Sequence, residues 1–112
     1  MPIEYVVKNN VHVFRPQSDL VLTAVQEAKD AIYPVIGNES VMRILVNLTE
    51  VRTIDSLGIG VLVAGLNALT ERHGKFAVCG LNERLKSALQ IIRLDTLLTI
   101  YANETEALEK ML

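Results

Sequence analysis

Two largely apolar runs, at 42–48 and 76–79, stand on either side of a longer stretch with helical periodicity. Short apolar runs of this kind are typical of interior strands in a parallel sheet that helices cover. The stretch between them opens with a polar turn at 53–56 and contains no proline up to Gly74. Together the segments predict a strand–helix–strand unit with a right-handed parallel crossover. The helix should face the core through Ile59, Leu62, Val63, Leu66 and Leu69.

The chain before this unit predicts a hairpin and a helix. Residues 3–8 and 11–15 are predicted strands, and Asn9-Asn10 between them tolerates the positive φ of a tight turn. Asp19 is the predicted N-cap of a helix over 20–33, which we expect Pro34 to end, leaving 35–40 as an exposed connection. This helix should pack through Val21, Ala24, Val25, Ala28 and Ile32.

The chain after the unit predicts two more helices and a short strand. Asn82 should cap a helix that ends near Arg93, and residues 97–101 form a last strand. Asn103 should cap a terminal helix, and Glu106 stands at the position from which its carboxylate can reach back to the cap residue. The inward side of the first of these helices should carry Leu85, Ala88, Leu89 and Ile92. The order β-β-α-β-α-β-α-β-α predicts a single α/β domain over residues 1–112, with a mixed sheet of four or five strands and about four helices.

Composition narrows the class of protein. Half of the 112 residues are hydrophobic, the formal net charge is −2, and no cluster of Lys and Arg occurs, which argues against nucleic-acid binding. No apolar run approaches the roughly 20 residues of a membrane span, and the N-terminus lacks the pattern of a signal peptide. We therefore expect a soluble, cytoplasmic protein without membrane insertion. The single cysteine, Cys79, should be a buried and inert thiol.

The candidate chemistry lies in the polar turn, where Asp55 and Ser56 follow a strand and open a helix. In α/β units the loop after the carboxyl end of a strand carries the site. Both residue types are also favourable helix caps, so the residues alone leave a cap and a functional site as equal alternatives. Dinucleotide and phosphate-loop motifs are incomplete around Gly58 and Gly60, which predicts close packing in place of a cofactor. Neither histidine has neighbours at metal-ligand spacing, so we expect no metal.

The run Thr53-Ile54-Asp55-Ser56-Leu57-Gly58-Ile59-Gly60-Val61-Leu62 resembles the signature of STAS domains, in particular the bacterial anti-sigma factor antagonists. That family places Asp-Ser-x-Gly after a buried strand, and the length and element order of this chain are also similar to it. The resemblance implies a STAS-type fold and a regulator of transcription in the stress response that is not an enzyme.

The resemblance also implies a phosphoserine switch. In such antagonists the serine at the position of Ser56 is phosphorylated by an anti-sigma factor that is itself a serine kinase, and a phosphatase resets it. The unphosphorylated form binds the kinase and so releases the sigma factor. The aspartate at Asp55 lies in the partner contact region, and the one matched by Asp19 lines the same surface.

Elementary chemistry is compatible with this switch. Backbone N–H groups at a helix N-terminus tolerate a phosphate, and glycines keep the neighbouring surface low for a partner's backbone. Leu57 and Val61 lie one turn apart and should form a small apolar contact beside the serine. The predicted partner-binding residues are Asp19, Asp55, Ser56, Leu57, Gly58, Gly60 and Val61.

Two alternatives remain at the level of sequence. One is a STAS subunit without a phospho-switch, either a component of a stressosome or an accessory of a transporter. The other is an enzyme that acts through Ser56, which is disfavoured because no general base lies near this serine in the sequence and a carboxylate alone activates a serine poorly.

Overall fold

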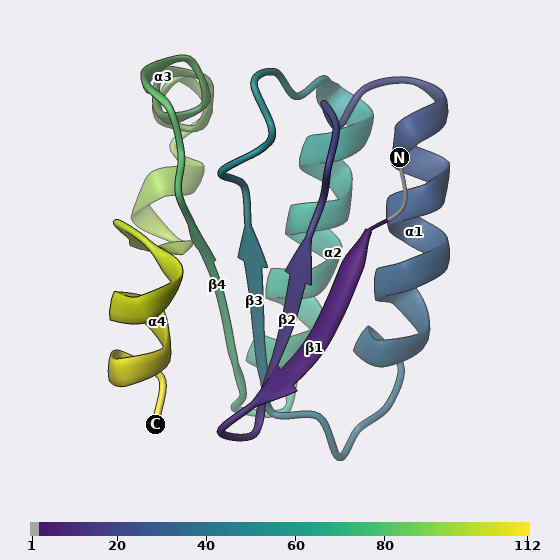
Figure 1. Cartoon of the computed structure of the whole chain (residues 1–112), viewed down its shortest axis with the longest axis vertical. Helices are drawn as coiled ribbons and strands as arrows, with labels where there is room; N and C mark the ends of the chain where they lie inside the picture. The colour runs from purple at the N-terminus through teal and green to yellow at the C-terminus, as the bar shows by residue number, and fades with distance from the viewer. Residues whose placement is uncertain (1–2) are drawn as a thin grey trace.

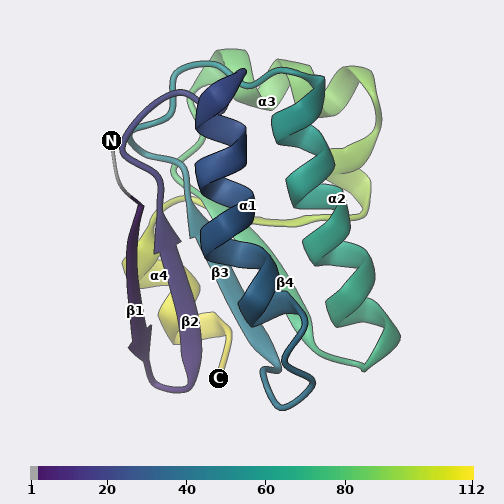
Figure 2. The same cartoon turned by 90° about the vertical axis from the view of Figure 1, so that its right-hand side faces the viewer.

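The computed structural model describes residues 3–112, in which a five-stranded sheet lies between two layers of helices (Figures 1 and 2). The strands neighbour one another in chain order: β1 (Glu4–Lys8), β2 (Val11–Arg15), β3 (Arg43–Asn47), β4 (Lys75–Cys79) and β5 (Thr99–Tyr101). β1 runs antiparallel to β2, and the remaining pairs are parallel. This confirms the predicted mixed α/β sheet and the parallel pairing of the two apolar runs.

The helices are α1 (Thr23–Ile36), α2 (Ser56–Glu71), α3 (Glu83–Ile91) and α4 (Glu104–Lys110), with a short 3-10 helix η1 (Leu94–Thr96) before β5. Figure 2 shows α1 and α2 in front of the sheet and α4 behind it. Side chains of β3 alternate between the two layers, since Ile44 and Val46 join the larger core under α1 and α2 and Leu45 joins the smaller core under α4. No helix within residues 3–112 is long and apolar enough to cross a membrane.

Local chemistry sets several boundaries as the sequence predicts. Asn9 and Asn10 both have positive φ, 52° and 64°, which is the backbone of the tight turn that joins β1 to β2. Asn82 and Asn103 are N-caps, and their side chains accept hydrogen bonds from the N–H groups of Leu85 and Glu106, at 2.8 and 2.9 Å. Both predicted caps are therefore confirmed.

Two small residues of α2 permit close packing. A Cβ added at Gly65 would collide with the ring of Phe76 on β4, and one at Gly58 would lie 2.5 Å from the backbone oxygen of Leu20. α2 therefore sits closer to the sheet and to the loop before α1 than larger side chains would permit. Leu62 and Leu69 are fully buried as predicted, while Ile59, Val63 and Leu66 are partly buried at the edge of the core.

The first helix differs from its prediction at both ends. It begins at Thr23 because Leu20 pairs with Ile54 as a parallel bridge, so Asp19 is not its N-cap. It also continues through Pro34 to Ile36. A proline so near the helix end removes only one backbone hydrogen bond, and the extra turn buries Ile36 against the core. Residues 35 and 36 are thus helical, and the predicted exposed connection is limited to 37–40.

The third helix also ends earlier than predicted. It stops at Ile91, and Ile92, predicted to face the core, is 51% exposed. The reason is the left-handed backbone of Arg93, with φ 61°, which turns the chain into η1. Leu94 of η1 is buried and joins the core.

Candidate functional site

Ser56 is the first residue of α2 and is exposed at the edge of the sheet where the parallel strands end. The preceding residue, Asp55, is the N-cap of this helix: its Oδ1 accepts a hydrogen bond from the N–H of Gly58 at 3.0 Å. One of the two sequence alternatives is therefore confirmed for Asp55. The capping carboxylate leaves Ser56 exposed beside it, so a cap and a site are compatible at this turn.

The second oxygen of Asp55 fastens another segment to the same point. Oδ2 accepts a hydrogen bond from the N–H of Leu22 at 3.0 Å, and the Asp55 N–H donates to the carbonyl of Leu20 at 3.2 Å. Hydrogen bonds from the Gly58 and Leu22 amides lower the pKa of the Asp55 carboxyl. One ionised carboxylate thus joins the loop before α1 to the start of α2.

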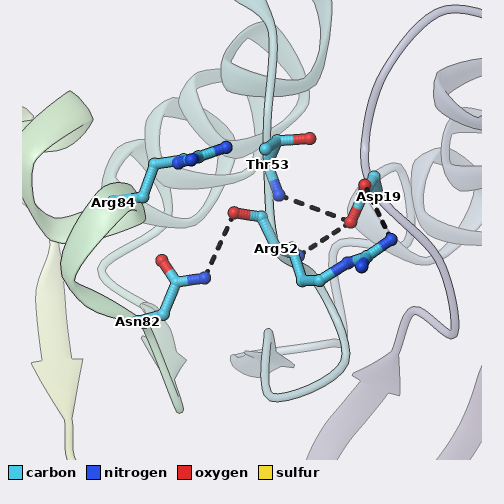
Figure 3. A pocket seen from close by; sticks show the side chains of 5 residues that line it. All are labelled: Asp19, Arg52, Thr53, Asn82 and Arg84. Atoms are coloured by element: carbon cyan, nitrogen blue, oxygen red, sulfur yellow. Dashed lines mark hydrogen bonds and ion pairs between the residues drawn. The ribbon is translucent and has the colours of Figure 1, made fainter.

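Asp19 fastens the same two loops a short distance away. Its Oδ1 accepts hydrogen bonds from the N–H groups of Arg52 and Thr53, at 2.8 and 3.4 Å, and these contacts lower the pKa of its carboxyl (Figure 3). The Leu20 N–H donates to the Thr53 carbonyl at 3.1 Å. The two predicted aspartates therefore lie on neighbouring parts of one surface, where each holds a loop with backbone hydrogen bonds.

An open pocket of about 490 Å³ lies between this surface and α3, lined by Asp19, Arg52, Thr53, Asn82 and Arg84. In Figure 3, Arg84 extends from α3 toward Thr53, and Asn82 donates from Nδ2 to the carbonyl of Arg52 at 3.1 Å. Arg52 Nη2 lies 3.8 Å from Asp19 Oδ2. Sequence reasoning missed both arginines as site residues. Each follows the carboxyl end of a parallel strand, and this position was the available signal.

The exposed part of the predicted surface is smaller than the sequence suggests. Leu57 is 54% exposed and Gly60 has open space around it. In contrast, Val61 is 1% exposed and Gly58 is buried, because α2 turns that side toward α1 and the Leu20 loop. Their role as contact residues stays a prediction, and in this structure both lie beneath the exposed residues.

Leu22 is an exposed apolar residue that the sequence analysis did not single out. Its side chain is 73% exposed, and its backbone has φ 51° and ψ −124°, a conformation that usually requires glycine. The amide that binds Asp55 belongs to this same residue. Leu22 and Leu57 therefore add two apolar side chains to the loops that the carboxylate of Asp55 joins.

Other reactive groups lie away from this surface. Cys79, the last residue of β4, is fully buried on the side of the sheet that α4 covers, and burial raises the pKa of its thiol to about 12, which confirms the prediction of a buried cysteine. The ring of His12 accepts or donates a hydrogen bond at Nδ1 with the hydroxyl of Tyr5, 2.6 Å away. Within residues 3–112 no group of three His, Cys, Asp or Glu side chains is arranged to hold a metal ion.

Comparison with known proteins places this geometry in a family. The family model described as STAS domain matches residues 2–107. A Thermotoga neapolitana protein with the provisional name of anti-sigma factor antagonist is 31% identical over 107 residues, which cover 96% of this chain and 95% of that protein. An anti-sigma F factor antagonist from Paenibacillus polymyxa is 28% identical, over 84% of this chain and 74% of that protein.

A solved structure extends the comparison to three dimensions. The crystal structure of a Thermotoga maritima protein, provisionally described as an anti-sigma factor antagonist, superimposes with a TM-score of 0.90 at 27% identity. The superposition covers 97% of this chain and 93% of that one.

Proposed function

The chain belongs to the STAS domain family and is similar to its anti-sigma factor antagonists, and we propose that it works as one through a phosphoserine switch. In this proposal the unphosphorylated protein binds an anti-sigma factor serine kinase in the cytoplasm and so releases a sigma factor. The observation that carries the proposal is the exposed Ser56 at the start of α2, directly after the capping Asp55.

A phosphate on Ser56 is compatible with the fold. The side chain is exposed at the first residue of a 16-residue helix, where the helix dipole favours negative charge by roughly 0.3–1 kcal/mol. The neighbouring carboxylate of Asp55 opposes part of that gain. Phosphorylation adds about −1.5 to −2 charges without requiring any buried group to move. The modification should therefore change the surface far more than the stability.

The proposed contact surface consists of the exposed residues around this serine. A kinase that docks here would meet Asp19, Asp55, Ser56, Leu57 and Gly60, and the structure adds Leu22. Gly58 and Val61 lie beneath this surface and hold α2 in place. Asp19 keeps one carboxylate oxygen free of backbone hydrogen bonds, and Asp55 keeps none. We therefore assign both aspartates mainly to positioning the loops that the partner contacts.

Electrostatic repulsion explains how the phosphate would release the partner. Two like charges 4 Å apart cost roughly 4 kcal/mol at an effective dielectric constant near 20, or nearly three decades of affinity. A docked partner that contributes a carboxylate near Ser56 would therefore be expelled. Removal of the phosphate by a phosphatase restores the neutral hydroxyl and the binding surface.

Calorimetric titration of the co-purified kinase tests the proposal. Ser56→Ala should bind like the wild type and resist phosphorylation, Ser56→Asp should bind more weakly, and the phosphorylated protein should bind weakest. Thr105→Asp is the matched control, because it places one negative charge near the start of α4, in the opposite helix layer. Equal affinity of the phosphorylated and unmodified proteins would refute the switch and favour the alternative of a STAS binding subunit without it.

A further inference from the structure

β1 is an edge strand whose outer side is free in the described sheet. Its only strand neighbour is β2, and Figure 2 shows it at the outer margin with no element beyond it. Tyr5 is 44% exposed and Val7 is 53% exposed. The opposite edge is formed by β5, which has only three residues. β1 is therefore the longer of the two edges available for pairing with another strand.

The hairpin determines which backbone groups of β1 point outward. A two-residue turn at Asn9-Asn10 makes Lys8 and Val11 the closing hydrogen-bonded pair, and such pairs alternate along an antiparallel ladder. Val6 therefore bonds to β2, while Tyr5 and Val7 direct their N–H and C=O groups to the free edge.

The strand sequence is complementary to itself when it is reversed. In an antiparallel pair of two copies centred on Val6, Glu4 lies opposite Lys8 of the other copy, and Tyr5 lies opposite Val7. The pairs that would exchange hydrogen bonds are then Tyr5 with Val7, whose backbone groups are the free ones. The direction of the free backbone N–H and C=O groups, the opposite charges and the aromatic–aliphatic contact thus all favour the same register.

The charges flanking β1 continue this complementarity. Within one copy, Lys8 Nζ lies 3.6 Å from Glu104 Oε2, and Arg15 Nη1 lies 3.4 Å from Glu4 Oε2. In the reversed pairing, Glu4 of one copy would enter the space beside Lys8 of the other, and positive and negative groups would alternate across the contact. The ring of Tyr5 stacks on that of Phe14, with centroids 4.6 Å apart, and this contact orients Tyr5 at the edge of the sheet.

We propose that two copies of this chain associate through antiparallel pairing of β1 with β1, centred on Val6, to form one continuous sheet. The contact is isologous and uses each edge once, so it closes as a dimer and leaves the Ser56 surface free. The Ser56 turn lies at the start of α2, away from β1 (Figure 2).

The first test removes an outward N–H. Val7→Pro deletes a hydrogen bond of the proposed contact and none to β2, whereas Val7→Thr keeps the N–H and the branched side chain. Sedimentation analysis of the full chain up to about 1 mM should show a dimer for wild type and Val7→Thr, and at least about tenfold weaker association for Val7→Pro. Equal thermal melting of the variants at low concentration shows that β1 remains folded. A wild type that stays monomeric, or Val7→Pro that dimerises equally well, would overturn the proposal.

The second test examines the register through charge. Glu4→Lys places lysines on both sides of the contact, and Lys8→Glu places glutamates there, so each variant alone should dimerise roughly ten- to a hundredfold more weakly. An equal mixture of the two restores opposite charges at both positions. Native mass spectrometry should then detect a mixed dimer in excess over either homodimer. A mixture that associates no better than its components would overturn the reversed register.

Discussion

Arg15 and Glu104 form a two-pronged ion pair that joins β2 to the first turn of α4. Nε and Nη2 of the arginine lie 2.8 and 2.7 Å from the two carboxylate oxygens. Asn47 donates to the same carboxylate at 3.1 Å, and Lys8 Nζ lies 3.6 Å away. These contacts lower the pKa of Glu104 to about 2, with the hydrogen bond from Arg15 as the largest cause. The last helix is thus fastened to the sheet by a carboxylate that remains ionised well into acid.

Glu104→Gln should reduce stability near neutral pH and lose this effect in acid. The folded-state pKa of Glu104 is about 2, below the ordinary 4.5. Its contribution is therefore complete above about pH 4.5 and disappears as the pH falls toward 2. Urea melts should show a deficit of about 2–3 kcal/mol near pH 7 and almost none near pH 2. Glu109→Gln, at an exposed position of α4, should show no such deficit.

Leu69→Ala should destabilise the protein by roughly 2–5 kcal/mol, because it leaves a cavity at a fully buried position of α2. Asn67→Ala, at an exposed position of the same helix, should change stability by less than about 0.5 kcal/mol. Chemical denaturation of both variants provides the comparison. Similar losses in the two variants would mean that α2 buries a different face.

Alanine at two glycines of α2 should have effects of opposite sign. Gly60 has no atom within 4 Å of an added Cβ, so Gly60→Ala should stabilise the helix by roughly 0.5–1 kcal/mol. At Gly65 the added Cβ would collide with the Phe76 ring, and the displacement should cost about 1–3 kcal/mol. Thermal melting distinguishes these outcomes. Binding of the kinase should weaken for Gly60→Ala if a partner backbone approaches there.

Leu22→Gly should raise stability and weaken binding of the anti-sigma partner at the same time. Glycine adopts the backbone conformation of Leu22 without strain, and relief of that strain should stabilise the protein by about 1–3 kcal/mol. The greater conformational entropy that glycine loses on folding offsets part of this gain. It also deletes an apolar side chain of the proposed contact surface. His73→Gly is the matched control, because His73 also has a positive φ, 60°, but lies at the end of α2 that is far from the proposed contact surface. A Leu22→Gly protein that binds the kinase as tightly as the wild type would remove Leu22 from that surface.

Features decided by neighbouring residues were predictable from the sequence. The Asn9-Asn10 turn and the caps at Asn82 and Asn103 depend on side chains that act within a few positions. The alternation of apolar runs likewise determined the order and direction of the strands. These features place Ser56 at the start of a helix and at the carboxyl edge of the sheet.

Features decided by distant residues were not predictable. Asp19 has the chemistry of a cap, but its hydrogen-bond donors lie 33 and 34 positions away, at Arg52 and Thr53. Pro34 was expected to end α1, and only the burial of Ile36 explains why the helix continues. Val61 carries no local sign that α2 is covered on that side as well. The sequence therefore indicated the chemistry of the candidate surface, while its exposed outline required the fold.

Because Cys79 is buried, the reactivity of its thiol reports on local unfolding of this protein. Its sulfur lies beneath α4, beside Ala107 and Met111, and it belongs to the only cysteine in the chain. A thiol reagent can reach it only when the surrounding cluster opens, and detachment of α4 is one such opening, so the labelling rate sets an upper limit on how often that helix leaves the sheet. Because Glu104 fastens the same helix, labelling would follow the release of α4 in the native protein without any added probe.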